Sequence, residues 1–333
     1  MSKKNEGKKK GNKGLKITLL SIFFILIFII GFGGFYIFST LNNMDKETIA
    51  KDNESIGIEK ETLDKFEGMD DITNILLLGI DSRSTDYVGR SDSMMILTID
   101  NIHNKLKLTS LMRDSYVDID GHGKDKLNHA YAFGKGQLAI KTVNQNFQLN
   151  IKDFVAVDFN GLEDMIDALG GVNMTITNEE LASLNSSITE QSRLRGVSPK
   201  HIDKAGSYNL NGIQAVAYAR IRYASGGDYK RTERQRVVLE AMFNKIKNAG
   251  VTQFPAIANE LLPNVRTSLS NMQVISLGTK VLSSGISGIE QQRFPLDKHS
   301  KGGYIGKVWY LQFDKDATRE EIYNYLFNDI KPE

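Results

Sequence analysis

The stretch "TNILLLGIDSRSTDYVGRSDSMMILTID", Thr73–Asp100, places a polar segment between two apolar runs. The first run, Thr73–Ile80, is typical of a strand that is covered on both faces of a sheet. The second run, Ser93–Asp100, predicts another strand. A polar turn, "NIHN", leads to a third run, Lys105–Met112, so the second and third runs are predicted to form a hairpin.

The polar segment holds two acids and two arginines: Asp81, Asp92, Arg83 and Arg90. If the first two strands are antiparallel, both aspartates lie at one edge of the sheet, and the third strand returns Arg113 and Asp114 to that edge. A pair of carboxylates suits Mg²⁺, which shares its remaining coordination positions with water and phosphate oxygens. Arginine forks bind phosphate in a bidentate way. The alternative interpretation is an ordinary solvated loop, because loops are commonly polar.

A second polar cluster, "YARIRYASGGDYKRTERQR", spans Tyr218–Arg236. It contains five arginines: Arg220, Arg222, Arg231, Arg234 and Arg236. Arg220 and Arg222 point the same way if the chain is extended there. Arg231 and Gln235 are four residues apart, so they share one face of the helix that follows.

Asp228 is expected in the loop before this helix. If the helix begins near Tyr229, Arg231 lies in its first turn, where the positive end of the helix dipole also favours an anion. Crowding arginines together is unfavourable unless a negative group lies between them. A pyrophosphate would be such a group.

The rest of the chain alternates strand and helix patterns. Asp153–Phe159 is predicted to be a buried strand, and Asn160–Gly171 a helix with Asn160 as its N-cap. Helical spacing recurs at Leu210–Arg220 and Arg231–Gly250. This alternation predicts an α/β fold, a three-layer α-β-α sandwich around a mixed, largely antiparallel sheet.

The N-terminal region predicts a membrane anchor. Ile17–Phe38 runs for 22 residues without a charge, about 33 Å as a helix, which is enough to cross a bilayer. All seven lysines of residues 1–38 precede it, so the positive-inside rule places the N-terminus in the cytoplasm. The predicted organisation is a Lys-rich cytoplasmic tail, a signal anchor, an extracellular stalk and an extracellular domain: residues 1–16, 17–38, 39–71 and 72–333.

The C-terminal tail, residues 251–333, is assigned to the same domain. Its pattern predicts a helix, a strand, a second strand that contains Trp309, and a closing helix.

Composition excludes several classes of function. Seven of the 42 basic residues and one of the 40 acids lie within residues 1–38, so the rest carries 35 basic and 39 acidic residues and gives no reason to expect nucleic-acid binding. The chain contains no cysteine, no Gly-x-Ser-x-Gly motif and no P-loop. Its five histidines show no metal-ligand spacing. An exported domain without disulfides suits a monoderm bacterium.

Five collinear motifs carry a resemblance to a known family. They are "NILLLGIDSR…GRSDSMMILTID", "LTSLMRDSYV", "KLNHAYAFG", "VDFNGLEDMIDALGGV" and "LNGIQAVAYARIR…DYKRTERQRVVLEAM", within residues 73–250. Together they resemble the LytR-CpsA-Psr family of Gram-positive envelope proteins. The resemblance implies a Mg²⁺-dependent phosphotransferase, with Mn²⁺ as the alternative metal. Such an enzyme moves a glycopolymer (teichoic acid, capsular polysaccharide or a similar chain) from a polyprenyl-pyrophosphate carrier onto peptidoglycan through a phosphodiester.

The resemblance also implies roles for residues. Asp81 and Asp92 would hold the metal. The pyrophosphate would be bound by Arg83, Arg90, Arg113, Arg220, Arg222, Arg231 and Gln235. Arg113, Asp228 and Arg231 would be catalytic, with Asp228 as the general base and Asp92 as its rival.

Two positions depart from the family pattern. Lys135 lies between two glycines that are expected to be adjacent, and Lys230 stands where a glycine is expected before Arg231. Neither departure removes a ligand.

A lipid substrate needs an apolar slot between the sheet and the helices, and four residues are candidates to line it: Phe133, Phe154, Phe159 and Met165. Ordinary core packing is the competing role for each. Two other functions remain open at this point, a pyrophosphatase that releases the lipid without transfer and a non-catalytic lipid-binding regulator of the envelope. A transcription factor is disfavoured, because residues 1–16 leave no room for a helix-turn-helix.

Overall fold

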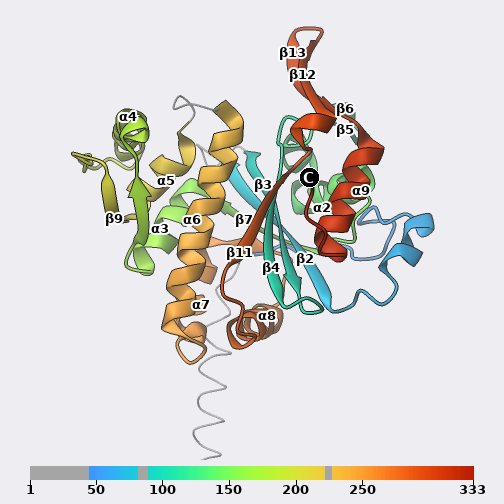
Figure 1. The fold of residues 1–333 in the computed structure, drawn as a ribbon, viewed down its shortest axis with the longest axis horizontal. Coiled ribbons are helices and arrows are strands. Elements are labelled where there is room, and N and C mark those ends of the chain that lie inside the picture. Colours follow the sequence, from blue (N-terminus) through green and yellow to red (C-terminus); the bar gives the residue numbers. More distant parts are fainter. Residues whose placement is uncertain (1–44, 82–88, 222–226) are drawn as a thin grey trace, which may run out of the picture. The chain divides into compact units, whose positions relative to one another are not determined.

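The computed structural model describes residues 45–81, 89–221 and 227–333 (Figure 1). Three predictions lie outside these residues: the anchor at 17–38, Arg83 and Arg222. Within the described ranges, none of the helices is both long enough and apolar enough to cross a bilayer.

A seven-stranded mixed sheet forms the centre of the described chain, in the order β1-β10-β7-β2-β3-β4-β11. Its strands are β1 (Asp45–Lys46), β2 (Ile72–Asp81), β3 (Arg90–Asp100), β4 (Lys105–Leu111), β7 (Asp153–Asp158), β10 (Arg266–Thr267) and β11 (Ile289–Phe294). β3 is antiparallel to both β2 and β4, which confirms the predicted hairpin, whereas β7 and β11 are parallel to their neighbours β2 and β4. The mixed sheet of an α/β fold is therefore confirmed.

Helices pack on both faces of this sheet (Figure 1). One face is covered by α2 (His129–Phe147) and α9 (Lys315–Phe327). The other is covered by α6 (Gly227–Ala249), α7 (Phe254–Leu261) and α8 (Asn271–Ser283). Beside them, α3 (Phe159–Ala168), α4 (Asn178–Leu194) and α5 (Gly212–Arg220) share a third apolar cluster with the small sheet of β8 (Val172–Ile176) and β9 (Gly206–Leu210).

Short elements complete the fold. They are η2 (Lys60–Phe66), η3 (Leu262–Asn264) and η4 (Asp297–His299), the hairpin of β5 (Tyr116–Ile119) with β6 (Gly123–Lys126), and the hairpin of β12 (Ser300–Ile305) with β13 (Val308–Phe313).

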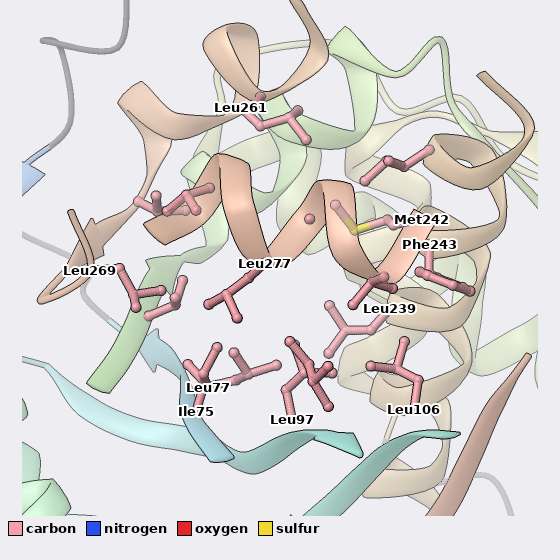
Figure 2. A pocket seen from close by; sticks show the side chains of 18 of the residues that line it. Ile75, Leu77, Leu97, Leu106, Leu239, Met242, Phe243, Leu261, Leu269 and Leu277 are labelled. Carbon is pink, nitrogen blue, oxygen red and sulfur yellow. The ribbon is translucent and has the colours of Figure 1, made fainter. Parts of the chain in front are cut away.

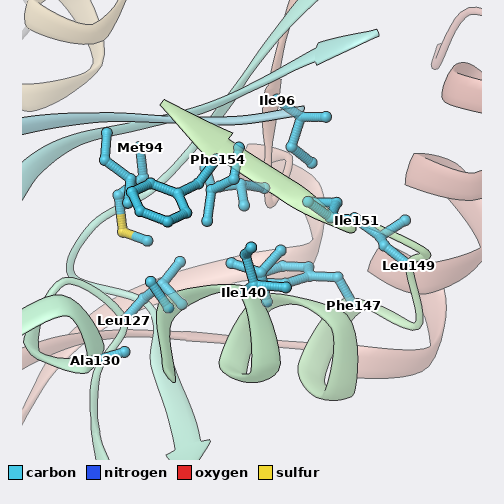
Figure 3. Packing of buried hydrophobic residues seen from close by; sticks show 14 of the residues in the cluster. Met94, Ile96, Leu127, Ala130, Ile140, Phe147, Leu149, Ile151 and Phe154 are labelled. Atoms are coloured by element: carbon cyan, nitrogen blue, oxygen red, sulfur yellow. The ribbon is translucent and has the colours of Figure 1, made fainter. Parts of the chain in front are cut away.

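The core beneath α2 fixes the position of β3. Met94 and Ile96, two apart on that strand, face the same side as Phe154 of β7 and pack against Ile140 and Phe147 of α2 (Figure 3). Full burial of one such side chain contributes about 1.5–3 kcal/mol. The core therefore holds the strands whose ends carry the predicted acids.

The segment before the first long strand belongs to the folded unit. Ile56 and Ile58 are buried in the core beneath α2, and a Cβ at Gly57 between them would clash with the Lys141 backbone. Residues 45–71 were predicted to be part of a stalk, but they pack as one compact unit with the rest of the described chain. Ile49, Phe66 and Met69 also pack against this core, and β1 pairs with β10. These contacts are scattered along a polar segment, so they give no periodic pattern to detect.

Helix starts differ from the prediction in two places. Asp158, not Asn160, is the N-cap of α3, because its Oδ1 accepts a hydrogen bond from the Gly161 amide at 2.8 Å. Helix α6 begins at Gly227, so Asp228 lies in its first turn rather than in a loop, and Arg231 comes one residue after that turn. The prediction that the tail joins the same domain agrees with β11, which pairs with β4 in the central sheet.

Candidate functional site

The edge of the sheet at the end of β2 carries both predicted metal ligands. The pairing of β2 with β3 shifts after Gly79, and Asp92 is the extra residue that this β-bulge leaves on β3. Asp81 then pairs with Arg90 at the last step of the ladder. A Cβ at Gly89 would clash with the Asp81 carbonyl, so the returning chain comes closer there than any side chain allows. The two aspartates are thus on adjacent strands at one edge, as predicted.

Arg113 follows β4 and joins this edge. Its Nη1 lies 2.8 Å from Asp92 Oδ2, its Nη2 lies 3.6 Å from Asp228 Oδ1, and its Nε lies 3.4 Å from Asp114 Oδ2. Burial alone would lower the pKa of Arg113, but the attraction of these three carboxylates outweighs burial and raises it. Arg113 is therefore a permanent cation, and its side chain retains some exposure to solvent.

Arg231 closes the group from the helical side. It is almost fully buried, and its Nη2 lies 3.0 Å from Asp228 Oδ2 and 3.4 Å from the Asp92 carbonyl oxygen. We call Asp92, Arg113, Asp228 and Arg231 the rim cluster. The prediction that the ends of neighbouring strands meet at one edge is confirmed for Asp92 and Arg113, and Asp228 and Arg231 of α6 join them as the family resemblance implied.

The rim cluster corrects one expectation about charge. The sequence suggested that a bound pyrophosphate would be needed to separate the arginines. In the structure, carboxylates of the protein pair with three of the five arginines of Tyr218–Arg236: Asp228 with Arg231, Glu180 with Arg234 and Glu190 with Arg220. The protein itself thus neutralises the crowded cations.

Two residues beside the rim cluster were not predicted. Asn128, the residue before α2, donates from Nδ2 to Asp92 Oδ1 at 3.3 Å, and Lys126 donates to Asp114 Oδ1 at 2.7 Å. Both lie in or next to the motif "KLNHAYAFG", whose order in the chain was the available signal. These contacts fix the direction of two carboxylates at the edge.

The two aspartates at this edge could supply some, but not all, of the oxygen ligands that a hard cation such as Mg²⁺ needs. Among the residues that the structure describes, no group of three or more histidine or acidic side chains could hold a metal ion. Asp81 and Asp92 supply two carboxylates from adjacent strands, and Mg²⁺ is commonly held by one or two carboxylates together with substrate phosphate oxygens. The residues therefore fit Mg²⁺ as a site that the substrate completes.

The other predicted anion ligands are placed unevenly. Arg90 is exposed at the edge of the sheet. Arg220 ends α5 instead of lying in an extended segment: it donates to Gln191, lies 3.5 Å from Glu190, and stacks over the Phe159 ring at 4.7 Å. The structure thus gives Arg220 partners on α4 and α3.

The arginines of α6 have two kinds of partner: Arg231 belongs to the rim cluster, whereas Arg234 and Arg236 contact neighbouring elements of the fold. Gln235 is one turn beyond Arg231, and within the described residues its buried Oε1 has no hydrogen-bond partner. Arg234 binds Glu180 of α4 at 2.9 Å, and Arg236 donates to Ser110 of β4 at 2.7 Å. Arg234 and Arg236 thus tie the helix to its neighbours.

The two departures from the family pattern have different surroundings. Lys135 lies in a kink of α2 with φ 50° and ψ −146°, a left-handed backbone that favours glycine. This conformation explains why the pattern calls for glycine there. Lys230 is half exposed and pairs with Glu233 at 2.9 Å, so it adds an ordinary surface ion pair.

Apolar cavities lie behind the rim cluster. A cavity of about 340 Å³ separates the sheet from α6, α7 and α8; Leu77 and Leu97 line it from the strands and Leu277 from α8 (Figure 2). A second cavity of about 150 Å³ shares Leu77 with the first and reaches Gln235, one turn beyond Arg231. An apolar space therefore begins next to the charged edge.

The predicted lining of a lipid slot is half right. Phe159 and Met165 line the smaller cavity. Phe154 is packed in the core beneath α2, on the opposite face of the sheet. Phe133 is exposed on α2 and stacks on His122. The alternation of side chains along β7 sends Phe154 to the other face, which the apolar pattern alone did not reveal.

A charged edge next to an apolar cavity suits a ligand with an anionic head and an apolar tail. The comparison with known families agrees, because the model of the LytR_cpsA_psr family matches residues 33–325. The chain belongs to this family. The resemblance seen in residues 73–250 is thereby confirmed and extends through the C-terminal tail.

Relatives and solved structures place the chain more closely. A polyisoprenyl-teichoic acid–peptidoglycan teichoic acid transferase, TagU, of Bacillus mycoides is 31% identical over 320 residues, which cover 93% of this chain and 96% of the relative. TagU of Enterococcus faecalis is 34% identical over 278 residues, covering 80% and 84%. The crystal structure of B. subtilis TagT has a TM-score of 0.64 at 26% identity, covering 85% of this chain and 99% of that one. A structure of TagT bound to LI-WTA has a TM-score of 0.65 at 26% identity, with 85% and 98% covered.

Proposed function

We propose that this protein is a phosphotransferase that attaches an anionic glycopolymer, carried on polyprenyl pyrophosphate, to peptidoglycan through a phosphodiester. The observation that carries the proposal is the rim cluster beside an apolar cavity that reaches Gln235, one turn beyond Arg231. The names of the TagU relatives support the same substrates. Teichoic acid is the first candidate for the polymer, and capsular polysaccharide or a similar chain is the alternative.

The reaction joins a sugar hydroxyl of peptidoglycan to the phosphorus that carries the glycopolymer. The new O–P bond forms as the bond from that phosphorus to the polyprenyl phosphate breaks, and the polyprenyl phosphate leaves. Negative charge grows on the phosphoryl oxygens and on the leaving group. We assign its stabilisation to Arg113 and Arg231 in the cluster, with Arg83, Arg90, Arg220, Arg222 and Gln235 as further ligands.

Asp81 and Asp92 would hold Mg²⁺, or Mn²⁺ in its place, with phosphate oxygens of the substrate completing the shell. The metal would supply further neutralisation of the phosphates. The bulge at Asp92 and the Asn128 hydrogen bond set the direction of one of the two carboxylates.

A carboxylate must take the proton of the attacking hydroxyl, and Asp228 is the better placed of the two candidates. Its side chain is 29% exposed, against 16% for Asp92. Both carboxylates are paired, Asp92 with Arg113 Nη1 at 2.8 Å and Asp228 with Arg231 Nη2 at 3.0 Å, so their exposure is what separates them. The more exposed Asp228 is easier for an acceptor hydroxyl to reach.

The polyprenyl tail would enter the apolar cavities between the sheet and α6, α7 and α8. We further propose that residues 17–38 anchor the chain in the cell membrane in a single-pass type II orientation, with the catalytic domain outside. This arrangement places the enzyme where lipid carriers and peptidoglycan meet.

Incubation of the full chain with a polyprenyl-pyrophosphate-linked sugar, Mg²⁺ and a peptidoglycan oligomer tests the proposal. A joined product is expected, and Asp228→Asn should slow its formation by about 10²–10⁴-fold. Asp316→Asn, at a carboxylate that is 94% exposed on α9, serves as the matched control and should keep full activity. Free sugar phosphate without joined product would instead assign a pyrophosphatase, and unchanged lipid would assign a binding protein.

A further inference from the structure

The β12–β13 hairpin extends away from the body of the described domain (Figure 1). Its strands pair from Ser300 with Phe313 to Ile305 with Val308, and the turn is made by Gly306, with φ 61°, and Lys307. The hairpin is a two-stranded sheet of its own, outside the central one. An isolated hairpin is marginally stable in water, so such an extension needs a reason.

The outer part of this hairpin exposes large apolar side chains. The exposed fractions are 74% for Tyr304, 38% for Ile305, 43% for Val308 and 39% for Trp309. Ile305 and Val308 flank the turn, and Tyr304 and Trp309 form the next cross-strand pair. A Cβ at Gly302 would clash with the Trp309 ring, so the indole lies against the strand and shows a face outward. Because successive residues of a strand point to opposite faces, the Tyr304–Trp309 pair and the Ile305–Val308 pair lie on opposite faces, so the outer end of the hairpin exposes apolar side chains on both faces.

The charge of the hairpin has one sign. Ser300–Phe313 contains Lys301 and Lys307 but no acidic residue. Both lysines are exposed, and neither forms an ion pair with any residue in the described part of the chain. Two free cations beside an apolar tip complement an anionic surface that also accepts apolar side chains.

We propose that the β12–β13 hairpin docks onto the surface of an anionic lipid bilayer. Aliphatic residues at the tip, aromatic residues in the next row and flanking lysines match the depth profile of a membrane interface, where Trp and Tyr lie at the level of the headgroups. Lysines near the surface add attraction to anionic lipids. A sugar platform would explain Trp309 and Tyr304 but not the aliphatic tip made by Ile305 and Val308.

Docking would also position the rim cluster. Leu311, at the base of the hairpin, donates its amide to the Asp114 carbonyl at 2.9 Å, and Asp114 follows Arg113 directly. From Leu311 to the turn at Gly306 the strand rises roughly 16 Å at about 3.3 Å per residue. A docked hairpin would hold the charged edge close to the headgroup layer. The inference rests on the hairpin alone and does not depend on the proposed transferase reaction.

Trp309 is the only tryptophan in the chain, so its fluorescence reports on the hairpin directly. The full chain is reconstituted in nanodiscs of phosphatidylglycerol whose acyl chains carry bromine near the headgroup, a short-range quencher. We expect a blue-shifted emission that the brominated lipid quenches by at least half. The Lys301→Glu/Lys307→Glu double variant should lose most of this quenching.

A second variant, with its single tryptophan elsewhere on the surface, controls for quenching that arises only because the anchored domain is near the bilayer. In a Trp309→Phe/Met272→Trp variant the single indole moves to α8, at a position that is 66% exposed, and its emission should stay unquenched. Trp309 emission typical of water and insensitive to brominated lipid would overturn the proposal. A shift that occurs only when a peptidoglycan oligomer is added would also overturn it and would assign the hairpin to a glycan.

Discussion

β3 and β4 carry a buried ion cluster at each end, and the two clusters are built differently. The rim cluster joins Asp92 and Arg113 to α6 at one end of the strand pair. At the other end, Lys107 contacts Asp100 and Asp329; we call these three residues the lysine cluster. Both clusters pair an acid of β3 with a cation on or just after β4. They differ in access to solvent: the lysine cluster is closed to solvent, whereas the rim cluster is open to it.

The lysine cluster is closed. The side chains of Lys107 and Asp100 are completely buried, and Nζ donates to Asp100 Oδ2 at 3.0 Å and to the Tyr325 carbonyl at 2.9 Å. Asp329 lies 3.1 Å from the same nitrogen. The three N–H donors of the ammonium go to Asp100 Oδ2, to the Tyr325 carbonyl and to the Leu326 carbonyl at 3.4 Å, so none remains for a ligand.

The rim cluster is open. Arg113 has five N–H donors, and its side chain is 16% exposed. Asp228 is 29% exposed. Spare donors at a partly solvated edge are what an incoming phosphate needs. The comparison teaches that unused bonding capacity, more than charge itself, separates a binding site from a structural ion pair.

The largest expected effect is on the closed cluster. Lys107→Met leaves Asp100 buried without its cation, which should lower the free energy of unfolding by about 3–5 kcal/mol. Lys105→Met removes the neighbouring lysine, whose ion pairs with Glu290 and Asp329 are 30% exposed on the lysine side, and should cost at most about 1 kcal/mol. Urea unfolding of both variants measures the difference. Equal losses of unfolding free energy in the two variants would show that the buried lysine cluster stabilises the protein no more than an exposed ion pair does.

The next effect is on turnover at the open cluster. Asp81→Asn and Asp92→Asn should each lower Mg²⁺-dependent turnover by on the order of 10²–10³-fold, because a charge-stabilising group is lost. Their unfolding free energies should stay near that of the unmodified protein, in contrast to Asp100→Asn in the closed cluster. Unimpaired turnover in either rim variant would remove that aspartate from the metal site.

Sequence patterns located the edge but not its details. Apolar runs predicted β2, β3 and β4, and antiparallel order then brought Asp81, Asp92 and Arg113 to one side. The bulge at Asp92 depends on pairing between strands, which no single run encodes. The packing of Ile56 into the core likewise depends on α2, more than 70 residues away along the chain. Local patterns thus predict elements, whereas contacts between distant segments decide register, caps and docking.

A buried carboxylate outside both clusters, Glu163, predicts how the stability of the protein depends on pH. Glu163 of α3 has a side chain that is 1% exposed, and Arg195 lies 3.1 Å from its Oε2. Burial raises the pKa of Glu163 from 4.5 to about 7, and this outweighs the opposing effects of a hydrogen bond from Gln191 and the charge of Arg195. One cation at the surface is therefore insufficient compensation for this buried acid.

The sign of the stability change follows from the raised pKa. Below pH 4.5 Glu163 is protonated in both the folded and the unfolded state, and between pH 4.5 and 7 the unfolded state loses its proton first. The free energy of unfolding should fall across this range by roughly 3 kcal/mol. Glu163→Gln should abolish this part of the pH dependence, whereas Glu179→Gln, at an exposed carboxylate of α4, should leave it intact. A Glu163→Gln variant with an unchanged pH profile would contradict the assignment.

The central claim is that the rim cluster is a phosphate-binding site, and Arg113→Lys tests it most directly. Lysine keeps the positive charge beside Asp92 and Asp228, so the melting temperature should barely change, but an ammonium cannot reproduce a bidentate fork. Arg266→Lys, at an exposed ion pair with Asp45, is the matched control. The measurement is the affinity of the full chain for polyprenyl pyrophosphate, by calorimetry. We expect Arg113→Lys to lose about 1.5–3 kcal/mol of binding, or roughly 10–150-fold, and Arg266→Lys to lose none. Unchanged affinity together with a lowered melting temperature would contradict the account and would make the rim cluster a second structural ion pair.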